Sequence, residues 1–245
     1  MRAQRLRHLQ EAITAIECGT CVTGGTGGLS ARASRSNPDE LPMPPGLHEW
    51  FGLTDAPRWI PPLGILLYLV NRSLTGEGSR AVAWIGRHCW PFLHGLPPAD
   101  RNVLLARSIF IDPPDEMSRL WAIDLAARCP ATAVVVTDGS GLNLAATRRL
   151  QLAAESGSAR VLCARPPGEM NHLSAATTRW LVHSAPSADK TPRWNVQLLR
   201  CKGMQPDGQW TVEWKSAQGG VVVHAVLADR PDPASKKGAL VRRSA

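Results

Sequence analysis

Short apolar runs alternate with longer amphipathic segments through the middle of the chain. Residues 81–85, 102–106 and 131–136 read as apolar strands, and residues 113–128 have the length and mixed composition of a helix. Apolar runs without alternation are typical of a parallel sheet that is buried on both faces. The three valines at 134–136 are β-branched, which favours a central strand.

The same pattern extends to both sides of this region. We predict a strand at 47–51 that Gly52 ends, a buried helix from 62 to 72, a helix at 143–155 and a strand at 161–163. Apolar and polar residues alternate in the last part of the chain, which predicts strands at 179–183, 194–200, 210–215 and 221–227. The sequence therefore predicts an α/β fold, with a mainly parallel central sheet flanked by helices and antiparallel strands at the C-terminal end.

The helix predicted at 113–128 has a broad apolar stripe, which we expect to be buried. The residues of this stripe are Met117, Leu120, Trp121, Ile123, Leu125 and Ala127. The charged residues between them, Arg119, Asp124 and Arg128, are expected to face water. Trp50 and Trp84 also stand in apolar runs, so we expect both in the core.

The chain has 245 residues, of which 44% are hydrophobic, so it can bury a full core in one large domain. We place this domain at 46–228. Residues 1–17 are predicted to form an amphipathic helix, residues 18–45 a flexible linker, and residues 229–245 a disordered basic tail.

The N-terminal segment has two interpretations. Leu6, Leu9 and Ile13 recur at steps of three and four, so they form one narrow apolar stripe on a basic helix. Such a helix either docks on its own domain or serves as a protein-binding arm. Trp90, in the loop after the strand at 81–85, is a second candidate anchor for a protein partner.

Charge and cysteine content narrow the class of protein. A net charge of +8 favours an acidic partner such as nucleic acid. Six cysteines without the spacing of a disulfide framework indicate reduced thiols in the cytoplasm. The longest apolar run, 63–70, is too short to cross a membrane. A single Cys18-x-x-Cys21 pair with no further ligand nearby is weak evidence for zinc, so we expect no metal site.

The segment after the strand at 47–51 stands where a nucleotide-binding α/β protein holds its phosphates. A working phosphate loop needs glycines, a lysine for the phosphates and a Ser or Thr for Mg²⁺. The loop here keeps Gly52 but otherwise reads Leu-Thr-Asp-Ala-Pro-Arg58-Trp59. Asp138 follows the central strand, at the edge where open α/β sheets carry their chemistry.

The ordered series of the Gly52 loop, the strand at 81–85, the stretch 96–105, a helix and the run 133–138 resembles the core of RecA-type recombinases. More specifically, it resembles the ImuA family of RecA-like accessory proteins of bacterial translesion mutagenesis, often labelled SulA-like. The closest matches lie at 148–155, 178–187, 192–203 and 210–214. The resemblance covers roughly residues 46 to 215.

The resemblance implies which residues of this chain stand at the nucleotide-binding positions of RecA-type proteins. Arg58 stands in place of the phosphate-loop lysine and Trp59 in place of the magnesium-binding Thr. Arg87 and His88 stand near the place of the catalytic glutamate, whereas Asp138 has a counterpart in the family. Trp cannot ligate Mg²⁺ and Arg87 and His88 supply no carboxylate, so we expect no enzyme activity and no cofactor.

By the same resemblance the protein would act through binding, as a scaffold in SOS-induced error-prone DNA synthesis. The implied partners are an ImuB-like relative of the Y-family polymerases and an error-prone replicative-type DNA polymerase, with RecA and single-stranded DNA as further candidates. Two alternatives stay open. One is a divergent DNA-dependent ATPase that uses Arg58 and Asp138, and the other is a SulA-like inhibitor of cell division.

Cations near tryptophans in the C-terminal strands give a candidate DNA surface. Bases can stack on indole rings while cations pair with phosphates. The candidate DNA-binding residues are Arg179, Arg193, Arg200 and Lys202, beside Trp180, Trp194 and Trp210. The competing interpretation places the tryptophans in the core, and we favour it for Trp194 and Trp210.

Overall fold

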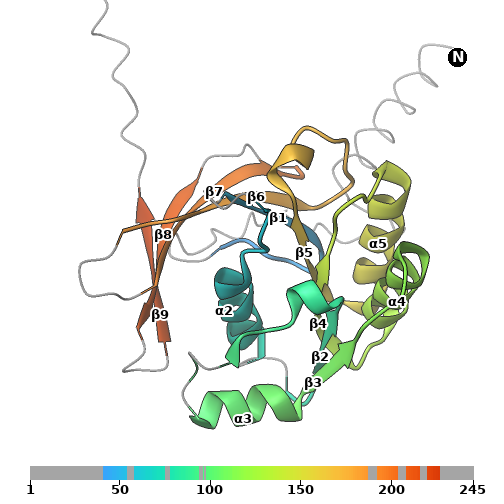
Figure 1. The fold of residues 1–245 in the computed structure, drawn as a ribbon, viewed down its shortest axis with the longest axis horizontal. Coiled ribbons are helices and arrows are strands. Elements are labelled where there is room, and N and C mark those ends of the chain that lie inside the picture. The colour runs from blue at the N-terminus through green and yellow to red at the C-terminus, as the bar shows by residue number, and fades with distance from the viewer. Residues whose placement is uncertain are drawn as a thin grey trace, which may run out of the picture.

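The computed structural model describes residues 41–53, 58–74, 78–93, 96, 98–186, 192–203, 208–215 and 220–226. Within these residues, the strands form one sheet of nine in the order β3-β2-β4-β5-β1-β6-β7-β8-β9 (Figure 1). The strands are β1 (Gly46–Leu53), β2 (Ala81–Ile85), β3 (Ser108–Ile111), β4 (Thr132–Asp138), β5 (Arg160–Arg165), β6 (Thr178–Ser184), β7 (Arg193–Cys201), β8 (Gln209–Lys215) and β9 (Gly220–Val226).

The first six strands of this order are parallel, and β6 to β9 are antiparallel to one another. The predicted fold class is therefore confirmed. The helices are α2 (Leu63–Leu74), α3 (Pro98–Ala106), α4 (Glu116–Arg128) and α5 (Leu144–Gly157), with short 3-10 turns η1 (Arg87–Cys89) and η3 (Pro167–Glu169). Among the described residues, no helix combines the length and the apolar character needed to span a bilayer.

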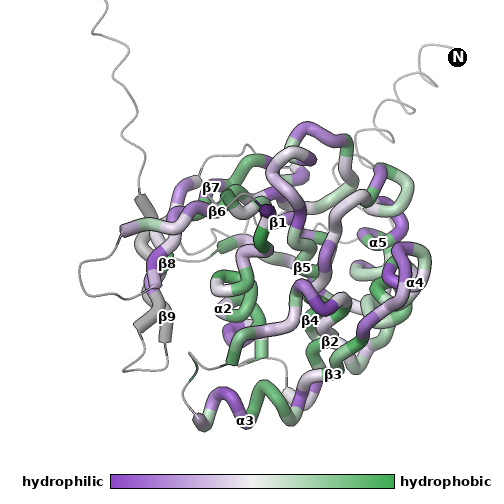
Figure 2. Tube along the Cα trace, viewed as in Figure 1, coloured by the Kyte–Doolittle hydropathy of each residue, from purple (hydrophilic) through white to green (hydrophobic). Residues whose placement is uncertain are grey.

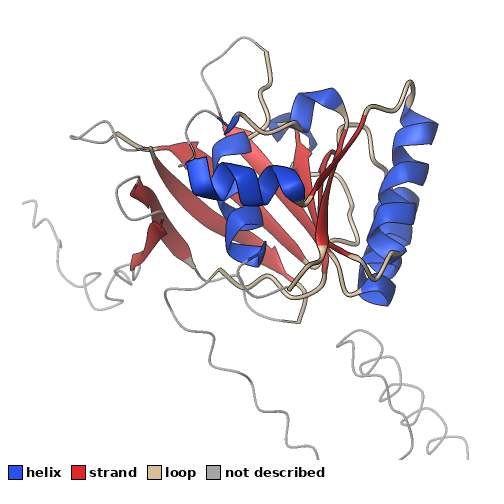
Figure 3. Cartoon of the chain, turned by 90° about the horizontal axis from the view of Figure 1, so that it is seen from below, coloured by secondary structure: helices blue, strands red, loops and turns tan. Residues whose placement is uncertain are grey.

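Helices cover both faces of the parallel strands (Figure 3). The connections from β1 and β2 run toward the β3 edge and carry α2 and α3, which pack in one core cluster. The connections from β3 and β4 run the other way and carry α4 and α5, which pack in a second cluster. Right-handed crossovers place connections of opposite direction on opposite faces, as seen here.

The strand predicted at 102–106 is wrong. These residues belong to α3, and the strand begins two residues later as β3. Pro98 suits the first turn of a helix and Asp100 favours its N-terminal end, whereas a short apolar run alone does not separate helix from strand. Leu104 is the buried residue of α3.

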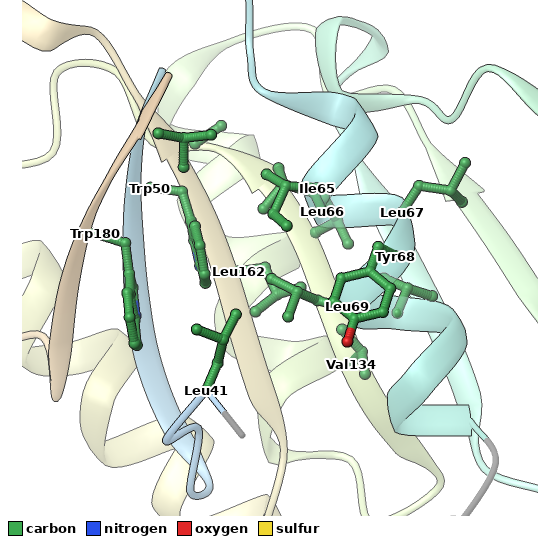
Figure 4. Close-up of a cluster of buried hydrophobic side chains, with 14 of the residues drawn as sticks. Leu41, Trp50, Ile65, Leu66, Leu67, Tyr68, Leu69, Val134, Leu162 and Trp180 are labelled. Atoms are coloured by element: carbon green, nitrogen blue, oxygen red, sulfur yellow. The ribbon is translucent and has the colours of Figure 1, made fainter. Parts of the chain in front are cut away.

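The core on the α2 side is built around stacked tryptophans (Figure 4). The rings of Trp50 and Trp180 stack with their centroids 5.2 Å apart, and Trp210 meets Trp180 edge to face at 5.4 Å. Such pairs add specific geometry to a large buried area. Helix α2 is apolar along most of its length (Figure 2), and it packs in the same core cluster as these rings and the central strands. Leu41, in the segment predicted as linker, is also buried in this core.

The predicted burial of Trp50, Trp84 and Trp210 is confirmed, and Trp194 is half-buried against the same core. Trp180 is fully buried, so it is not available to stack a base. Gly52 does not end the first strand but lies within β1, where its Cα faces Pro62 of the next segment.

On the α4 and α5 side, the residues of α4 that are buried differ from the predicted apolar stripe. Ala122, Ile123 and Ala127 are buried, whereas three large residues point outward. The outward residues are Met117, Trp121 and Leu125. Arg119, predicted to face water, is mostly covered instead, because it reaches the end of β4. Apolar residues therefore lie on both sides of α4, and periodicity alone did not indicate which side meets the sheet.

Candidate functional site at the carboxyl end of the parallel strands

The carboxyl ends of β2 and β4 meet where the chain connections turn to opposite faces of the sheet. These two strands are neighbours, and the segments that follow them lead to α3 on one face and to α5 on the other. Open α/β sheets bind ligands at such switch points. Gly86 follows β2 with a φ of +87°, a conformation that glycine adopts without strain, and its Cα faces Asp138 of β4.

Asp138 is the central side chain of this site. Its Oδ1 accepts a hydrogen bond from Ser140 N at 2.8 Å, and its Oδ2 lies 3.4 Å from Arg119 Nη1 and 3.7 Å from His88 Nδ1. The Asp138 side chain is only 10% exposed, whereas His88 is 78% exposed. Arg119 also donates to Ser140 O at 2.9 Å. The carboxylate predicted at this strand end is thus held by groups of the protein itself.

The thiol of Cys89 lies in the same region and is not poised as a nucleophile. Burial, followed by the negative charge of Asp138, raises the pKa of Cys89 far above that of a free thiol. A thiol with a raised pKa stays protonated at neutral pH, and the thiolate is the reactive form. The described residues contain no cluster of three or more His, Cys, Asp or Glu side chains that could hold a metal ion. Cys18 and Cys21 lie outside the described residues.

The two degenerate phosphate-loop residues, Arg58 and Trp59, differ in exposure. Arg58 is exposed, whereas Trp59 is half-buried and packs against the core on the α2 side. The indole Nε1 of Trp59 is buried without a hydrogen-bond partner among the described residues. An aromatic ring that packs on the core here leaves the segment before α2 without a Mg²⁺ ligand at that position.

A buried ionic network lies on the α5 side of β1, β5 and β6. Glu49 of β1 accepts from Arg165 Nη1 at 2.6 Å, from Arg179 Nε at 2.7 Å and from Ser174 Oγ at 2.7 Å. Both Glu49 and Arg165 are fully buried. Arg165 also contacts Glu169 at 2.6 Å. Breaking such a network by removing one partner costs about 3–5 kcal/mol, because a charge is left buried and unpaired.

Sequence reasoning missed this network. Neither Glu49 nor Arg165 is among the site residues that the sequence predicts. The available signal was the presence of charged residues inside two otherwise apolar strands, since a buried charge requires a partner.

The network also corrects one predicted DNA contact. Arg179 is buried against Glu49, and its guanidinium lies 5.0 Å from the centre of the Phe51 ring, so Arg179 does not face solvent. Arg193 is half-buried and forms an ion pair with Glu213. Arg200 and Lys202 are exposed near the end of β7, and Arg200 donates to Ser174 O at 2.9 Å. The four predicted residues therefore do not form one free cationic surface.

Of the predicted protein-binding residues, the structure describes Trp90. Leu6, Leu9 and Ile13 lie outside the described residues. Trp90, predicted as an exposed anchor, is half-buried: it packs on the core and meets Phe110 edge to face at 5.5 Å. The loop after β2 folds back on the sheet edge because Phe110 of β3 offers an aromatic surface there.

Comparison with known proteins gives a direct relative. The sequence is 33% identical over 165 residues to Protein ImuA from two strains of Caulobacter vibrioides. This chain is a homologue of ImuA. The alignment covers 61% of this chain and 66% of each ImuA protein, just under two thirds of their length. No family model matches the sequence.

A solved structure is also similar in part. The crystal structure of SulA from Pseudomonas aeruginosa matches 49% of this ImuA homologue and 97% of its own chain, with 23% identity and a TM-score of 0.35.

Proposed function

We propose that the protein is a non-catalytic accessory factor in DNA-damage-induced mutagenesis, and that it brings polymerase components together at damaged DNA. Homology to ImuA supports the process, since the ImuA resemblance implies translesion mutagenesis. The proposal that the protein is not a catalyst rests on Asp138, whose carboxylate contacts Arg119 and accepts a hydrogen bond from Ser140 N.

A nucleotide with Mg²⁺ would need that carboxylate. In strand-end sites of this class an acidic side chain serves the metal, and Mg²⁺ demands nearly ideal oxygen geometry. Here Mg²⁺ would have to displace the Arg119 guanidinium from Asp138, and the position of the hydroxyl ligand is taken by Trp59, which packs on the core. Both contacts oppose assembly of a magnesium nucleotide site.

By the same proposal the partners are an ImuB-like relative of the Y-family polymerases and an error-prone replicative-type DNA polymerase. RecA and single-stranded DNA are further candidates. Co-elution of the purified chain with each purified polymerase component in size-exclusion chromatography tests these partners one at a time.

Nucleotide binding is the first test. Mg²⁺-ATP is titrated to millimolar concentration into the full chain, with and without single-stranded DNA, while tryptophan fluorescence and phosphate release are recorded. We expect neither a saturable fluorescence change nor hydrolysis. Saturable binding that Arg58→Ala removes would contradict the proposal and favour the ATPase alternative. A Trp59→Phe variant shows whether any fluorescence change originates in the segment before α2.

A genetic test addresses the process itself. A strain that lacks the gene should show a lower frequency of damage-induced mutation, and the wild-type gene should restore it. Asp138→Asn keeps the size of the side chain and the acceptor for Ser140, so it should restore mutagenesis as well as wild type. Failure of Asp138→Asn at normal protein level would indicate that the carboxylate has a catalytic role.

A further inference from the structure

One edge of the sheet carries more than half of the large exposed apolar side chains in the described residues. Strand β3 is the last strand at this edge, and α3 and α4 precede and follow it in the chain (Figure 1). Of the thirteen such side chains, seven belong to these three elements. We call these seven residues the β3 edge surface: Val103 and Leu105 of α3, Ile109 and Phe110 of β3, and Met117, Trp121 and Leu125 of α4.

The β3 edge surface extends over both faces of the sheet. Phe110 is aligned with Trp84, which packs in the core cluster of α2 and α3, so Phe110 points to that face. Ile109 is aligned with Ala83 of the other cluster, so it points to the face that carries α4. On that face α4 is the helix nearer to the edge, since it packs on β4 and β2 whereas α5 packs on β1 and β5. A partner that covers the surface must therefore reach both faces.

The backbone of β3 has hydrogen-bonding groups that point away from the sheet. Gly86 N, just after β2, donates to Ile111 O of β3 at 2.9 Å. In a parallel pair only alternate residues of a strand bond the neighbouring strand, so the N–H and C=O groups of Ser108 and Phe110 point outward. No described strand pairs with this side of β3. Outward groups of this kind are a template for a further strand.

We propose that the β3 edge surface joins two copies of this chain about a two-fold axis, with β3 antiparallel to β3 of the second copy. Phe110 of each chain would lie opposite Phe110 of the other, and the two residues would exchange backbone hydrogen bonds. The axis also places α4 beside α4 of the copy on one face and α3 beside α3 on the other. This inference does not depend on a role in mutagenesis.

The extent of the surface favours a second copy over a single added strand. A lone strand would pair with β3, but it would leave Met117, Trp121 and Leu125 of α4 exposed to water. Burying such side chains is the main source of interface stability. A partner that brings a strand with a helix on each face covers the whole surface, and this chain has that architecture at the β3 edge.

The charges of α4 suit an antiparallel pair of helices. Its N-terminal end carries the exposed carboxylates of Asp115 and Glu116. At its C-terminal end Arg128 and Arg149 both bind Asp124, which leaves one positive charge in excess. An antiparallel pair places the negative end of each helix against the positive end of the other, whereas a parallel pair would bring like ends together.

The remaining exposed carboxylate of these two helices lies away from the contact. Glu155 Oε1 accepts from Gln151 Nε2 at 2.7 Å, and Gln151 Oε1 accepts from Leu47 N of β1 at 2.8 Å. Glu155 is therefore on the side of α5 that faces β1, and α4 packs on the side of β4 and β2. It does not oppose the pairing of α4 with its copy.

Sedimentation velocity of the full chain between about 1 and 100 µM tests the assembly, since this range covers weak protein interfaces. We expect a species of twice the chain mass that grows with concentration, and no larger species, because a two-fold contact closes on itself. Hydrogen exchange at the two ends of this range tests the strand pairing. The amides of residues 108–112 should exchange more slowly at the higher concentration.

Variants locate the contact. Ile109→Lys places a charge within the strand pair, and Trp121→Ser with Leu125→Ser removes the centre of the helix contact. Each should weaken the dimer about tenfold or more. Leu173→Ser removes an apolar side chain that is 75% exposed outside the surface, and it should leave the dimer unchanged. Because all four positions are exposed, circular dichroism should show every variant folded as wild type.

Charge reversal tests the antiparallel order of the helices. Glu116→Arg and Arg128→Glu should each weaken the dimer at low salt, because each places like charges together across the axis. The double variant inverts both ends of α4, so its dimer should return toward wild-type strength. Failure of the double variant to recover would contradict the antiparallel order.

Three further outcomes would overturn the proposal. The first is a chain that remains monomeric at about 100 µM. The second is a dimer that neither Ile109→Lys nor Trp121→Ser with Leu125→Ser weakens. The third is assembly that continues beyond two chains, which would indicate a head-to-tail contact between unlike surfaces.

Discussion

His48 and Glu49 are adjacent in β1, and both are fully buried. Their side chains point to opposite faces of the sheet and have different hydrogen-bond partners. Glu49 faces α5 and is paired with two arginines. His48 faces the other side, where its Nε2 donates to Pro44 O at 2.7 Å and its Nδ1 accepts from Thr178 Oγ1 at 2.7 Å. Thr178 Oγ1 in turn accepts from Trp180 Nε1 at 2.6 Å. These bonds fit the neutral imidazole with its proton on Nε2, the form that burial favours.

The neutral state of His48 makes stability depend on pH. Burial lowers the pKa of His48 from 6.5 to about 4. The unfolded chain therefore binds more protons than the folded chain between these values, and stability present above pH 6.5 is lost as pH falls toward 4. We expect His48 to contribute a loss of about 2–3 kcal/mol between pH 7 and pH 4.5. Urea unfolding at the two pH values measures it.

Two variants separate this effect from general acid denaturation. His48→Gln removes the titrating group, so the free energy of unfolding should fall less between pH 7 and pH 4.5 than in wild type. His88→Gln alters a histidine that is 78% exposed, and the pH dependence should stay that of wild type. An unchanged pH dependence in His48→Gln would contradict the assignment.

At the scale of elements, the close approach of α4 and α5 depends on one glycine. A Cβ at Gly157, at the end of α5, would lie 2.0 Å from Ala127 O of α4. Backbone atoms at that distance must move, whereas helix propensity alone would favour alanine over glycine. Steric overlap is the larger effect here, because the obstructing atom belongs to a rigid helix.

We therefore expect Gly157→Ala to lower the free energy of unfolding by about 1–3 kcal/mol. Urea denaturation measures the change. Gly168→Ala is the matched control, since a Cβ there would meet nothing within 4 Å, and its stability should remain within about 0.5 kcal/mol of wild type. A neutral or stabilising Gly157→Ala would show that the two helices can separate without cost.

The elements that the sequence predicted well are those with one strong signal. The run 131–136 is apolar except for Thr132, and it became the fully buried β4, which begins at Thr132 and extends through Thr137 and Asp138. The run 102–106 failed because it borders two elements, and α3 took its apolar residues while β3 began after them. For α4 the helix was predicted but its buried side was not, since apolar residues occur on both sides.

In the candidate site, too, positions that depend on local sequence were predicted, whereas contacts between distant residues were not. Asp138 could be placed at a strand end from local sequence, but its partner Arg119 comes from a helix whose orientation was mispredicted. Arg179 was assigned to DNA because a cation beside a tryptophan suits that role, yet its partner Glu49 is 130 residues away in sequence. Contacts over such separations depend on strand order, which local patterns do not define.

On the scale of the whole molecule, a net charge of +8 favours nucleic acid as a partner. Of the predicted DNA-binding residues, Arg200 and Lys202 are exposed. If each meets one phosphate of single-stranded DNA, Arg200→Ala with Lys202→Ala should reduce the slope of log affinity against log salt by about 1.4. Titrations of labelled DNA at several salt concentrations measure the slope.

A matched pair tests whether position or net charge matters. Arg128→Ala with Arg148→Ala removes two exposed cations from helices α4 and α5 and changes net charge by the same amount. We expect a smaller reduction in slope from this pair. Equal reductions from both pairs would mean that DNA responds to total charge and does not contact the end of β7.

The place of β1 in the sheet has a consequence for how the chain folds during synthesis. Strand β1 comes first along the chain but lies between β5 and β6, and its Glu49 pairs with an arginine 130 residues later. At about 5–20 residues per second, a ribosome needs roughly 6–26 s to make that stretch. Until β5 is made Trp50 and Phe51 have no neighbouring strand, and until β6 is made they have only one of their two. We expect the nascent chain to need a chaperone that shields this apolar segment until β6 emerges.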